Sequence, residues 1–543
     1  MNMKCFLISL LFLAGQSLNL HAQFFDSSNL PIVVITTNDG IPIPDEPKID
    51  AHLGIIWNGG GAISHLGDPF NEYDGQIAIE IRGSSSQMFL KKNYAIETRH
   101  EDGSNNNVSI FGFPADNDWV LHGPYSDKSL MRNALAYTLA GWLMDYAPRV
   151  RFCEVVLNGK YNGVYLFTEK IKRDAGRVNI SELHPDETTG DDVTGGYILK
   201  FDKWDGAFND GFPSAYSSNL SGFGQTVFQY HYPKPDEIVP EQKEYIQKYI
   251  AGLEDALMSP DFASPATGYR HYFDMASFFN YFFVQELGKN VDGYRLSTFF
   301  YKDKDSIDAR LKMGPVWDFN LAFGNADYCD AWYTNGWAWR FNEVCPNDYF
   351  NVHFWWERLW QDSTYRQEMK ARWFDLRNDT LSDDRIFGLI DSLETLLQEP
   401  ALRNFQRYPV LGQYVWPNAF TGQNFGEEVD YLRNWLTARL LWLDETMKTV
   451  DLPEYRIEDY FPPVVYPNPF RGEVKFEYYV RSDTPVSVEV YDMNGQLAGR
   501  MTDASHFNGI NSLTWGMGVP AGLYFYRILA NGNEVKKGKV VKN

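Results

Sequence analysis

Two aspartates with a predicted strand pair between them are the residues of this sequence best placed to do chemistry. Asp292 stands in a loop after a helical pattern, and Asp318 stands in Trp-Asp-Phe-Asn. Between them, residues 296–301 and 311–316 are β-branched and aromatic runs joined by a charged turn, which predicts a hairpin that ends at Asp318. Either aspartate alone is more typical of a turn or a strand cap. The pair around one hairpin favours chemistry, since one carboxylate can accept a proton and the other can bind a hard cation.

This layout is typical of phosphoryl transfer from ATP, in which one aspartate orients the acceptor hydroxyl and a second holds Mg²⁺ on the phosphates. Upstream, the alternating run 76–82 and the run 93–98 predict two strands. A Gly-Ser-Ser-Ser turn lies between them, with Lys91 and Lys92 entering the second strand. The hydroxyl of Ser85 and free backbone N–H groups could donate to phosphate oxygens. An ordinary hairpin loop with solvated lysines is the other interpretation of this segment.

Other predicted elements surround these segments. Asn158-Gly159 is a strong turn signal and predicts a hairpin of residues 151–157 with 163–168. Glu169 ends that hairpin, where it would pair with the phosphate lysine, line a nucleotide pocket or remain an exposed strand-end charge. Helical patterns with recognisable caps cover residues 128–144, 240–257, 274–287, 383–398 and 427–448. The helix at 274–287 is heavily aromatic, so we expect it to be buried and to lead directly into Asp292.

Length, composition and charge limit the possible functions. The chain has 543 residues, 44% of them hydrophobic and 16% aromatic, which predicts several globular domains. A net charge of −22 argues against nucleic acid as a partner, because binding phosphate backbones requires clustered basic residues. Residues 1–22 combine one lysine, an apolar core and a polar end, which predicts a secretory signal peptide. No later segment is long and apolar enough to predict a transmembrane span.

The four cysteines fall into three settings. Cys5 lies in the predicted signal peptide, and Cys153 lies in an apolar run that predicts a buried thiol. Cys329 and Cys345 close a short aromatic loop and could form a disulfide in an oxidising compartment, but the sequence leaves that pairing open. The absence of a CxxC motif or a Cys/His ligand spacing argues against a zinc site.

The sequence predicts an α+β protein with an all-β tail. A β/loop extension is expected at residues 23–75, followed by the main domain at 76–450. A proline-rich linker is expected at 451–470. Residues 471–543 contain strand runs separated by Asn-Gly turns, which predicts a small immunoglobulin-like β-sandwich.

The C-terminal motifs resemble a known export signal. YPNPF, VYDMNGQL, GLYFY and a lysine-rich end are similar to the type A sorting domain of the Bacteroidetes type IX secretion system. The resemblance implies handling by the type IX secretion machinery and a location on the outer-membrane surface or in the extracellular space.

The central region resembles the CotH (spore coat protein H) kinase family. The motifs that carry the resemblance occur in the family's order: RGSSSQMFLKKNYAIE, SLMRNALAY, GVYLFTEKI, GGYILKFDK, NVDGYRLSTFFYKD and GPVWDFNLAFG. The resemblance implies an atypical protein-kinase-like domain with two lobes. It also implies a secreted enzyme that uses ATP with Mg²⁺ or Mn²⁺ and phosphorylates Ser or Thr hydroxyls of exported or surface proteins.

Site residues carry over from the family by position. Asp292 matches the catalytic-loop aspartate, Asp318 matches the metal-binding aspartate, and Lys91 of the lysine pair matches the phosphate-binding lysine. Ser297 and Asn320 stand where many members have Asn and Asp, respectively. They keep neutral oxygen ligands for a metal but remove negative charge.

That loss of charge motivates a second hypothesis from a different class. A catalytically weak or inactive kinase-fold surface protein would bind a glycan or a structural partner. Glycoside hydrolysis by a carboxylate pair is a third possibility, suggested by the aromatic content.

Overall fold

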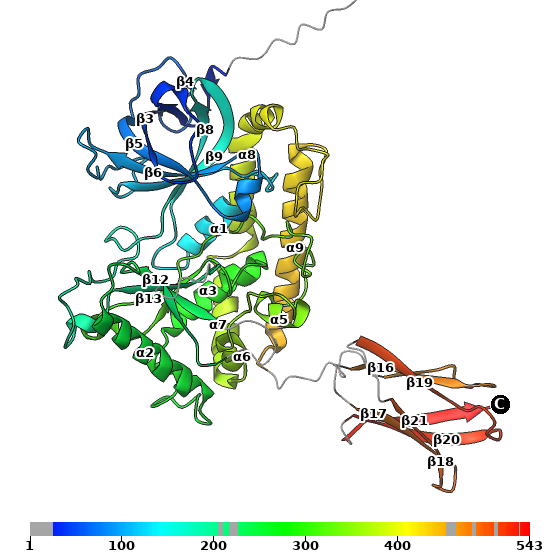
Figure 1. The fold of residues 1–543 in the computed structure, drawn as a ribbon. Helices are drawn as coiled ribbons and strands as arrows, with labels where there is room; N and C mark the ends of the chain where they lie inside the picture. The colour runs from blue at the N-terminus through cyan, green and yellow to red at the C-terminus, as the bar shows by residue number, and fades with distance from the viewer. Residues whose placement is uncertain are drawn as a thin grey trace, which may run out of the picture. The chain divides into compact units, whose positions relative to one another are not determined.

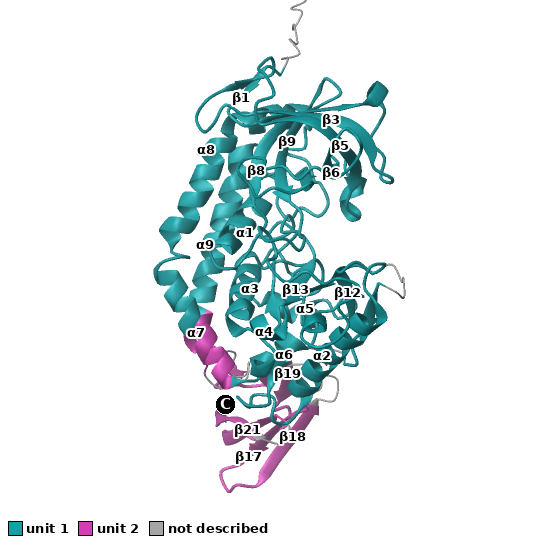
Figure 2. Cartoon of the chain, turned by 90° about the vertical axis from the view of Figure 1, so that its left-hand side faces the viewer, with its two compact units in different colours: residues 1–362, 371–445 teal, residues 363–370, 446–543 magenta. Residues whose placement is uncertain are grey.

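The computed structural model describes residues 25–204, 210–216, 226–451, 463–480, 485–503, 509–530 and 533–543. The predicted signal peptide lies outside these residues. The chain divides into two compact units, one formed by residues 1–362 and 371–445 and the other by residues 363–370 and 446–543 (Figure 2). The first unit is mixed α+β, and the tail of the second is all-β, as the sequence predicts.

Seven strands of the first unit close into a barrel in the order β2-β3-β5-β6-β7-β9-β8 (Figure 1). Their inward-facing isoleucines, valines and aromatic residues form one buried core. The predicted Asn158-Gly159 hairpin is confirmed, with a positive φ at both residues. Strands β2 and β3 fall within the predicted extension at 23–75, yet they belong to the barrel, because β2 pairs in parallel with β8. The barrel strands are β2 (Ile32–Thr37), β3 (Ile49–Ile56), β5 (Tyr73–Arg82), β6 (Asn93–Arg99), β7 (Asp118–His122), β8 (Val150–Leu157) and β9 (Lys160–Glu169). The short strands β1 (Ser27–Ser28) and β4 (Ser64–His65) pair beside it.

A second sheet of the same unit has the order β11-β12-β10-β13-β14. The hairpin predicted between the two aspartates is present, with Phe300 opposite Met313. Its strands are shorter than predicted at their outer ends, since β13 begins at Thr298 and β14 ends at Met313, directly before Gly314 with a φ of 110°. A helical turn, α4 (Asp305–Asp308), lies in the connection. Asp318 therefore lies several residues beyond β14 and not at its end. The strands are β10 (Tyr197–Phe201), β11 (Gly211–Pro213), β12 (Val227–Tyr232), β13 (Thr298–Lys302) and β14 (Lys312–Met313).

Helices pack around both sheets of the first unit, and α8 and α9 run side by side in both views (Figures 1 and 2). The aromatic helix α3 is almost entirely buried, as expected, and Asp274 caps it by accepting a hydrogen bond from the Ser277 N–H group. The helices are α1 (Arg132–Gly141), α2 (Pro240–Met258), α3 (Met275–Gly288), α5 (Phe341–Val344), α6 (Trp355–Trp360), α7 (Ser363–Asn378), α8 (Asp383–Arg407) and α9 (Phe425–Thr449). No helix in the described part of the chain is long and apolar enough to cross a membrane.

Several helix ends differ from the prediction by one to nine residues, among them the following three. Helix α1 begins at Arg132, because the Asp127 carboxylate accepts hydrogen bonds from the N–H groups of Ser129 and Arg132 and holds the preceding residues as a loop. Helix α3 includes Gly288, and the left-handed residue that ends it is Lys289. Helix α8 continues through Pro400 to Arg407, where tertiary contacts with the barrel outweigh the proline.

The tail of the second unit contains two antiparallel sheets that share one hydrophobic core. Phe476 and Trp515 come from the first sheet, and Val488 and Ile528 from the second. Strand β15 lies inside the predicted linker at 451–470 and pairs with β16, so the sandwich begins before residue 471. The strands are β15 (Val464–Tyr466), β16 (Val474–Val480), β17 (Val486–Tyr491), β18 (Leu497–Asp503), β19 (Gly509–Trp515), β20 (Gly522–Ala530) and β21 (Asn533–Lys542).

Candidate functional site

A cavity of about 420 Å³ lies between the β5–β6 hairpin and the segment that carries the two aspartates. Its volume is within the range of small-molecule binding sites. The cavity brings together five of the residues predicted from the sequence: Ser85, Asp292, Ser297, Asp318 and Asn320. Its lining also holds four cations and four carboxylates: Arg82, Lys170, Lys200, Lys203, Asp127, Asp202, Asp292 and Asp318.

Helix α1 fixes the backbone at Asp318. The Phe319 N–H group donates to Asn133 Oδ1 at 2.7 Å, and the Asp318 N–H group donates to the Tyr137 hydroxyl at 3.1 Å. Asn133 and Tyr137 are one helical turn apart and therefore share a face of α1. Asp318 has a φ of 55°, in the left-handed region that Asp and Asn tolerate better than most residues.

The Asp318 carboxylate is electrostatically unusual. Burial raises its pKa to about 6, and the negative charges of Asp202 and Asp292 act in the same direction. The positive charge of Arg82 and a hydrogen bond from Ser297 Oγ to Asp318 Oδ2, 3.1 Å long, oppose the shift. A cation bound beside Asp318 would favour its ionised form.

Asn290 connects the loops of the two aspartates. Its Oδ1 accepts a hydrogen bond from the Asp292 N–H group at 3.2 Å, and its Nδ2 donates to the Asp318 carbonyl oxygen at 3.4 Å. The Asp292 carboxylate forms an ion pair with Arg295, whose Nη2 lies 3.1 Å from Oδ1. Burial raises the pKa of Asp292, while the charges of Arg295 and Lys203 oppose that shift.

Lys91, Lys92 and Glu169 are not among the residues that line this cavity. Lys91 is buried between the barrel and α8, where its ammonium group donates to the Val164 carbonyl and to Asn404 Oδ1. Lys92 donates to the Gln87 carbonyl. Glu169 is buried in an ion pair with Arg149. The phosphate and nucleotide roles assigned to these three residues stay predictions.

The sequence interpretation missed Arg82, which lines the cavity at the end of β5. Its guanidinium carbon lies 5.4 Å from the centroid of the Trp317 ring, which also stacks on Tyr137. Within the described residues, the Arg82 side chain makes no hydrogen bond or ion pair, so its guanidinium donors are available to a ligand. The signal in the sequence was an arginine that ends an alternating strand directly before the Gly-Ser-Ser-Ser turn.

The donor set at the Asp318 end fits a magnesium ion that keeps water and phosphate ligands. Asp318 and Ser297 already lie within hydrogen-bonding distance, and Asn320 lines the same cavity. Among the described residues, no three His, Cys, Asp or Glu side chains cluster as a metal site. Mg²⁺ is commonly held by one or two carboxylates with substrate phosphates and water, so a single carboxylate with neutral oxygens is an adequate protein contribution.

The fold and the cavity thus define a mixed α+β domain with an aspartate pair facing an unpaired arginine, followed by an all-β tail. The model of the CotH kinase protein family matches residues 79–443, more than half of the chain. The chain therefore belongs to the CotH kinase family. A second model, the secretion system C-terminal sorting domain, matches residues 464–543.

The chain is also similar to the inner spore coat protein H of Bacillus subtilis (strain 168). It is 34% identical to this chain over 95 residues, which are 18% of this chain and 24% of the relative. The chain therefore matches about a quarter of that protein's length.

The sorting domain indicates export by the type IX secretion machinery to the cell surface or the extracellular space. The CotH kinase region and the sorting domain are thus separate parts of one chain.

Proposed function

We propose that this protein is a secreted kinase that transfers the γ-phosphoryl group of ATP to Ser or Thr hydroxyls of exported or surface proteins. The observation that carries the proposal is that Asp292 and Asp318 line one cavity and that the Asn290 side chain hydrogen-bonds to the backbone of both. Arg82 and the serine turn lie on the lining as well and supply donors for phosphate oxygens. In this proposal the barrel and the helical region are the two lobes of a kinase-like domain, which starts at β2, near residue 32, and not at residue 76, and extends to about residue 450.

Each residue has a role that its position supports. Asp292 orients the acceptor hydroxyl and accepts its proton as the oxygen bonds to phosphorus and the bond to ADP breaks. Asp318, with Ser297 and Asn320, would hold Mg²⁺, which neutralises phosphate charge when it is bound. Arg82 binds phosphate oxygens, and the turn that contains Ser85 covers them.

Phosphate transfer from labelled ATP by the full mature chain tests the proposal. We expect incorporation with Mg²⁺ or Mn²⁺ that is lost in Asp292→Asn and in Asp318→Asn. Asp375→Asn is the matched control, because Asp375 is exposed on α7 and pairs only with Arg372 among the described residues. Wild-type protein that neither transfers phosphate nor binds Mg-ATP would overturn the proposal.

The second candidate is a kinase-fold surface protein without catalytic activity. The observation that favours it is the single carboxylate at the proposed metal end, where Ser297 and Asn320 are neutral. This protein would bind glycans or a structural partner with unchanged affinity in Asp292→Asn and Asp318→Asn. A glycan array probed with the wild-type protein and both variants separates the two candidates.

A further inference from the structure

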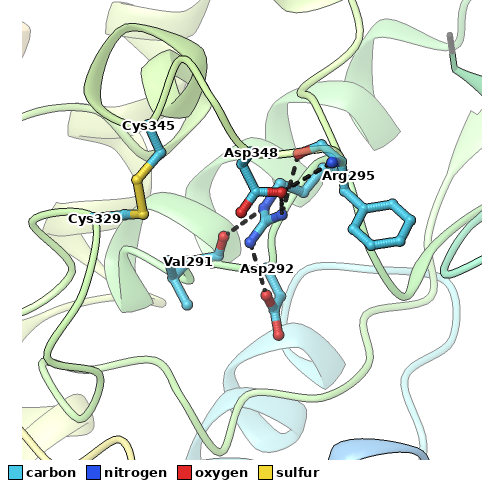
Figure 3. The surroundings of a disulfide bond; sticks show 7 residues. Val291, Asp292, Arg295, Cys329, Cys345 and Asp348 are labelled. Atoms are coloured by element: carbon cyan, nitrogen blue, oxygen red, sulfur yellow. Dashed lines mark hydrogen bonds and ion pairs between the residues drawn. A yellow bond between two sulfur atoms is a disulfide. The ribbon is translucent and has the colours of Figure 1, made fainter. Parts of the chain in front are cut away.

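The Asp292 segment, residues 289–295, is held at its C-terminal end by Arg295. The Arg295 side chain is 3% exposed, and besides its ion pair with Asp292 it donates from Nε to the Val291 carbonyl at 2.9 Å. Its Nη1 donates to Asp348 Oδ1 at 3.2 Å and to the Phe350 carbonyl at 3.1 Å (Figure 3). Arg295 therefore connects Asp292 to a segment more than fifty residues further along the chain.

The partners of Arg295 lie in or beside a loop that a disulfide closes. Cys329 and Cys345 are bonded, which settles the pairing that the sequence left open (Figure 3). We call residues 329–345 the disulfide loop. Asp348 follows the loop after two further residues, and the centroid of the Phe341 ring inside the loop lies 3.9 Å from the Arg295 guanidinium carbon. The position of the disulfide loop therefore determines where two partners of the Arg295 guanidinium lie: the Asp348 carboxylate and the Phe341 ring.

The disulfide loop also holds the beginning of the Asp292 segment. Lys289 Nζ donates to three carbonyl oxygens of the loop, those of Asp330, Tyr333 and Asn335, at 2.7, 3.1 and 2.7 Å. Lys289 is a left-handed residue at the end of α3. Both ends of the Asp292 segment are thus attached to the same cross-linked loop.

We propose that the disulfide loop is a brace that positions Asp292, with Arg295 and Asp348 as positioning residues for phosphate transfer. This inference rests on the proposed function, because it assigns Asp292 the acceptor-orienting role. A buried arginine with a planar fork can fix a carboxylate in both direction and distance. A loop whose ends are covalently joined samples fewer conformations, so the groups that it presents to Arg295 and Lys289 stay in place.

The brace predicts a specific kinetic pattern. Displacing Asp292 weakens the chemical step without touching the residues proposed to bind ATP, so kcat falls while KM for ATP stays within about twofold. We expect a fall in kcat of about 10- to 100-fold in Arg295→Gln and about 3- to 10-fold in Asp348→Ala and in the double variant Cys329→Ala/Cys345→Ala. Arg295→Lys keeps the positive charge and recovers part of the loss.

A pH profile separates positioning from simple stability. The charged groups that act on Asp292 are Arg295, Lys203, Asp348 and Asp202, with Asp318 across the same cavity, and the Tyr328 hydroxyl also lies within its electrostatic reach. Removing the Arg295 charge favours protonated Asp292, so the acid limb of the kcat profile moves to higher pH in Arg295→Gln. Arg295→Lys leaves the limb near its wild-type position.

Arg340→Gln is the matched control. Arg340 lies inside the disulfide loop, where it forms an ion pair with Glu343 at 2.6 Å and lies over the Trp339 ring, and within the described residues it makes no hydrogen bond or ion pair with the Asp292 segment. We expect wild-type kcat, KM and pH profile in this variant. Loss of kcat in Arg340→Gln equal to that in Arg295→Gln would overturn the proposal, as would an unchanged kcat in Arg295→Gln and the double cysteine variant.

Hydrogen–deuterium exchange gives a readout that does not need activity. We expect faster exchange over residues 289–297 in Arg295→Gln and in the double cysteine variant, and unchanged exchange there in Arg340→Gln. If the wild-type protein transfers no phosphate, the proposed function fails, and this exchange pattern still decides whether the loop braces the segment. Unchanged exchange in Arg295→Gln and the cysteine variant would reject the brace.

Discussion

The two walls of the cavity are built in opposite ways. On the aspartate wall, Asp292 and Asp318 have their backbones tied by Asn290 and α1, and one of them is ion-paired. On the arginine wall, Arg82 has no polar partner among the described residues, and the following Gly83 and Ser84 are exposed. In the proposed function, the aspartate wall is therefore organised before ATP binds, and the arginine wall gains its polar partners from the phosphates.

The largest effects on activity are expected from substitutions of the two aspartates, and each substitution should impair a different step. Asp292→Asn removes the group proposed to accept the proton and should lower kcat by about 10²- to 10⁴-fold with Mg-ATP affinity preserved. Asp318→Asn should abolish the Mg²⁺ dependence of ATP binding, which calorimetry measures with and without the metal. Equal loss of ATP affinity in both variants would show that the two aspartates do not have separate roles.

The next largest effect is on KM for ATP, which should distinguish Arg82 from Lys91, two cationic residues in or next to the β5–β6 hairpin. Arg82→Gln should raise KM for ATP by about 10-fold or more, because it removes a charged donor to phosphate. Lys91→Met should leave KM within about twofold and lower the melting temperature, since it breaks the buried hydrogen bonds to Val164 and Asn404. A large rise in KM for Lys91→Met with no change for Arg82→Gln would restore Lys91 to the phosphate role predicted from the sequence.

A pH effect of intermediate size follows from Asp318. Its pKa of about 6 means that the metal-free carboxyl takes up a proton as the pH falls through 6. The affinity for Mg-ATP should therefore decrease below that pH, and the decrease should be absent in Asp318→Asn. Isothermal titration of Mg-ATP at pH 5, 6 and 7.5 measures it, and pH-independent affinity in the wild-type protein would contradict the assignment.

The smallest expected effect is on stability. A carboxyl whose pKa is raised in the folded state stabilises the fold when it is protonated, and that stabilisation is lost as the pH rises through about 6. Without metal at pH 7.5, Asp318→Asn should therefore be more stable than the wild type, by on the order of 1–3 kcal/mol. Thermal melts should show the difference shrinking toward pH 4, and a variant that is less stable at pH 7.5 would exclude this account.

Local patterns predicted the parts of the fold that depend on neighbours in sequence. The Asn158-Gly159 turn and the Asp274 cap are confirmed because a two-residue turn and a side-chain cap are decided within a few residues. The extent of α8 beyond Pro400 was wrong because contacts with distant barrel strands decide it. The disulfide between Cys329 and Cys345 was left open for the same reason, since spacing alone does not bring two thiols together.

In the candidate site, too, residues close together in sequence were predicted more successfully than residues placed by distant contacts. Asp292 and Asp318 flank one predicted hairpin, so their spacing indicated that they could meet, whereas Ser297 was assigned from the family resemblance alone. Lys91 was chosen by its place in a motif, but the direction of its side chain depends on α8, more than 300 residues away in the chain. Arg82 begins the RGSSSQ motif at the end of β5, but the sequence does not show that its side chain lines the same cavity as the two aspartates.

The parallel pairing of β2 with β8 has a practical consequence for making the protein in pieces. The family match begins at residue 79, inside β5, so an expression fragment cut at that boundary would lack β2 and β3 and part of β5. It would leave β8 without β2 and the end of β6 without the missing part of β5, and these open edges favour intermolecular strand pairing. Recombinant fragments that begin before Ile32 avoid this aggregation hazard.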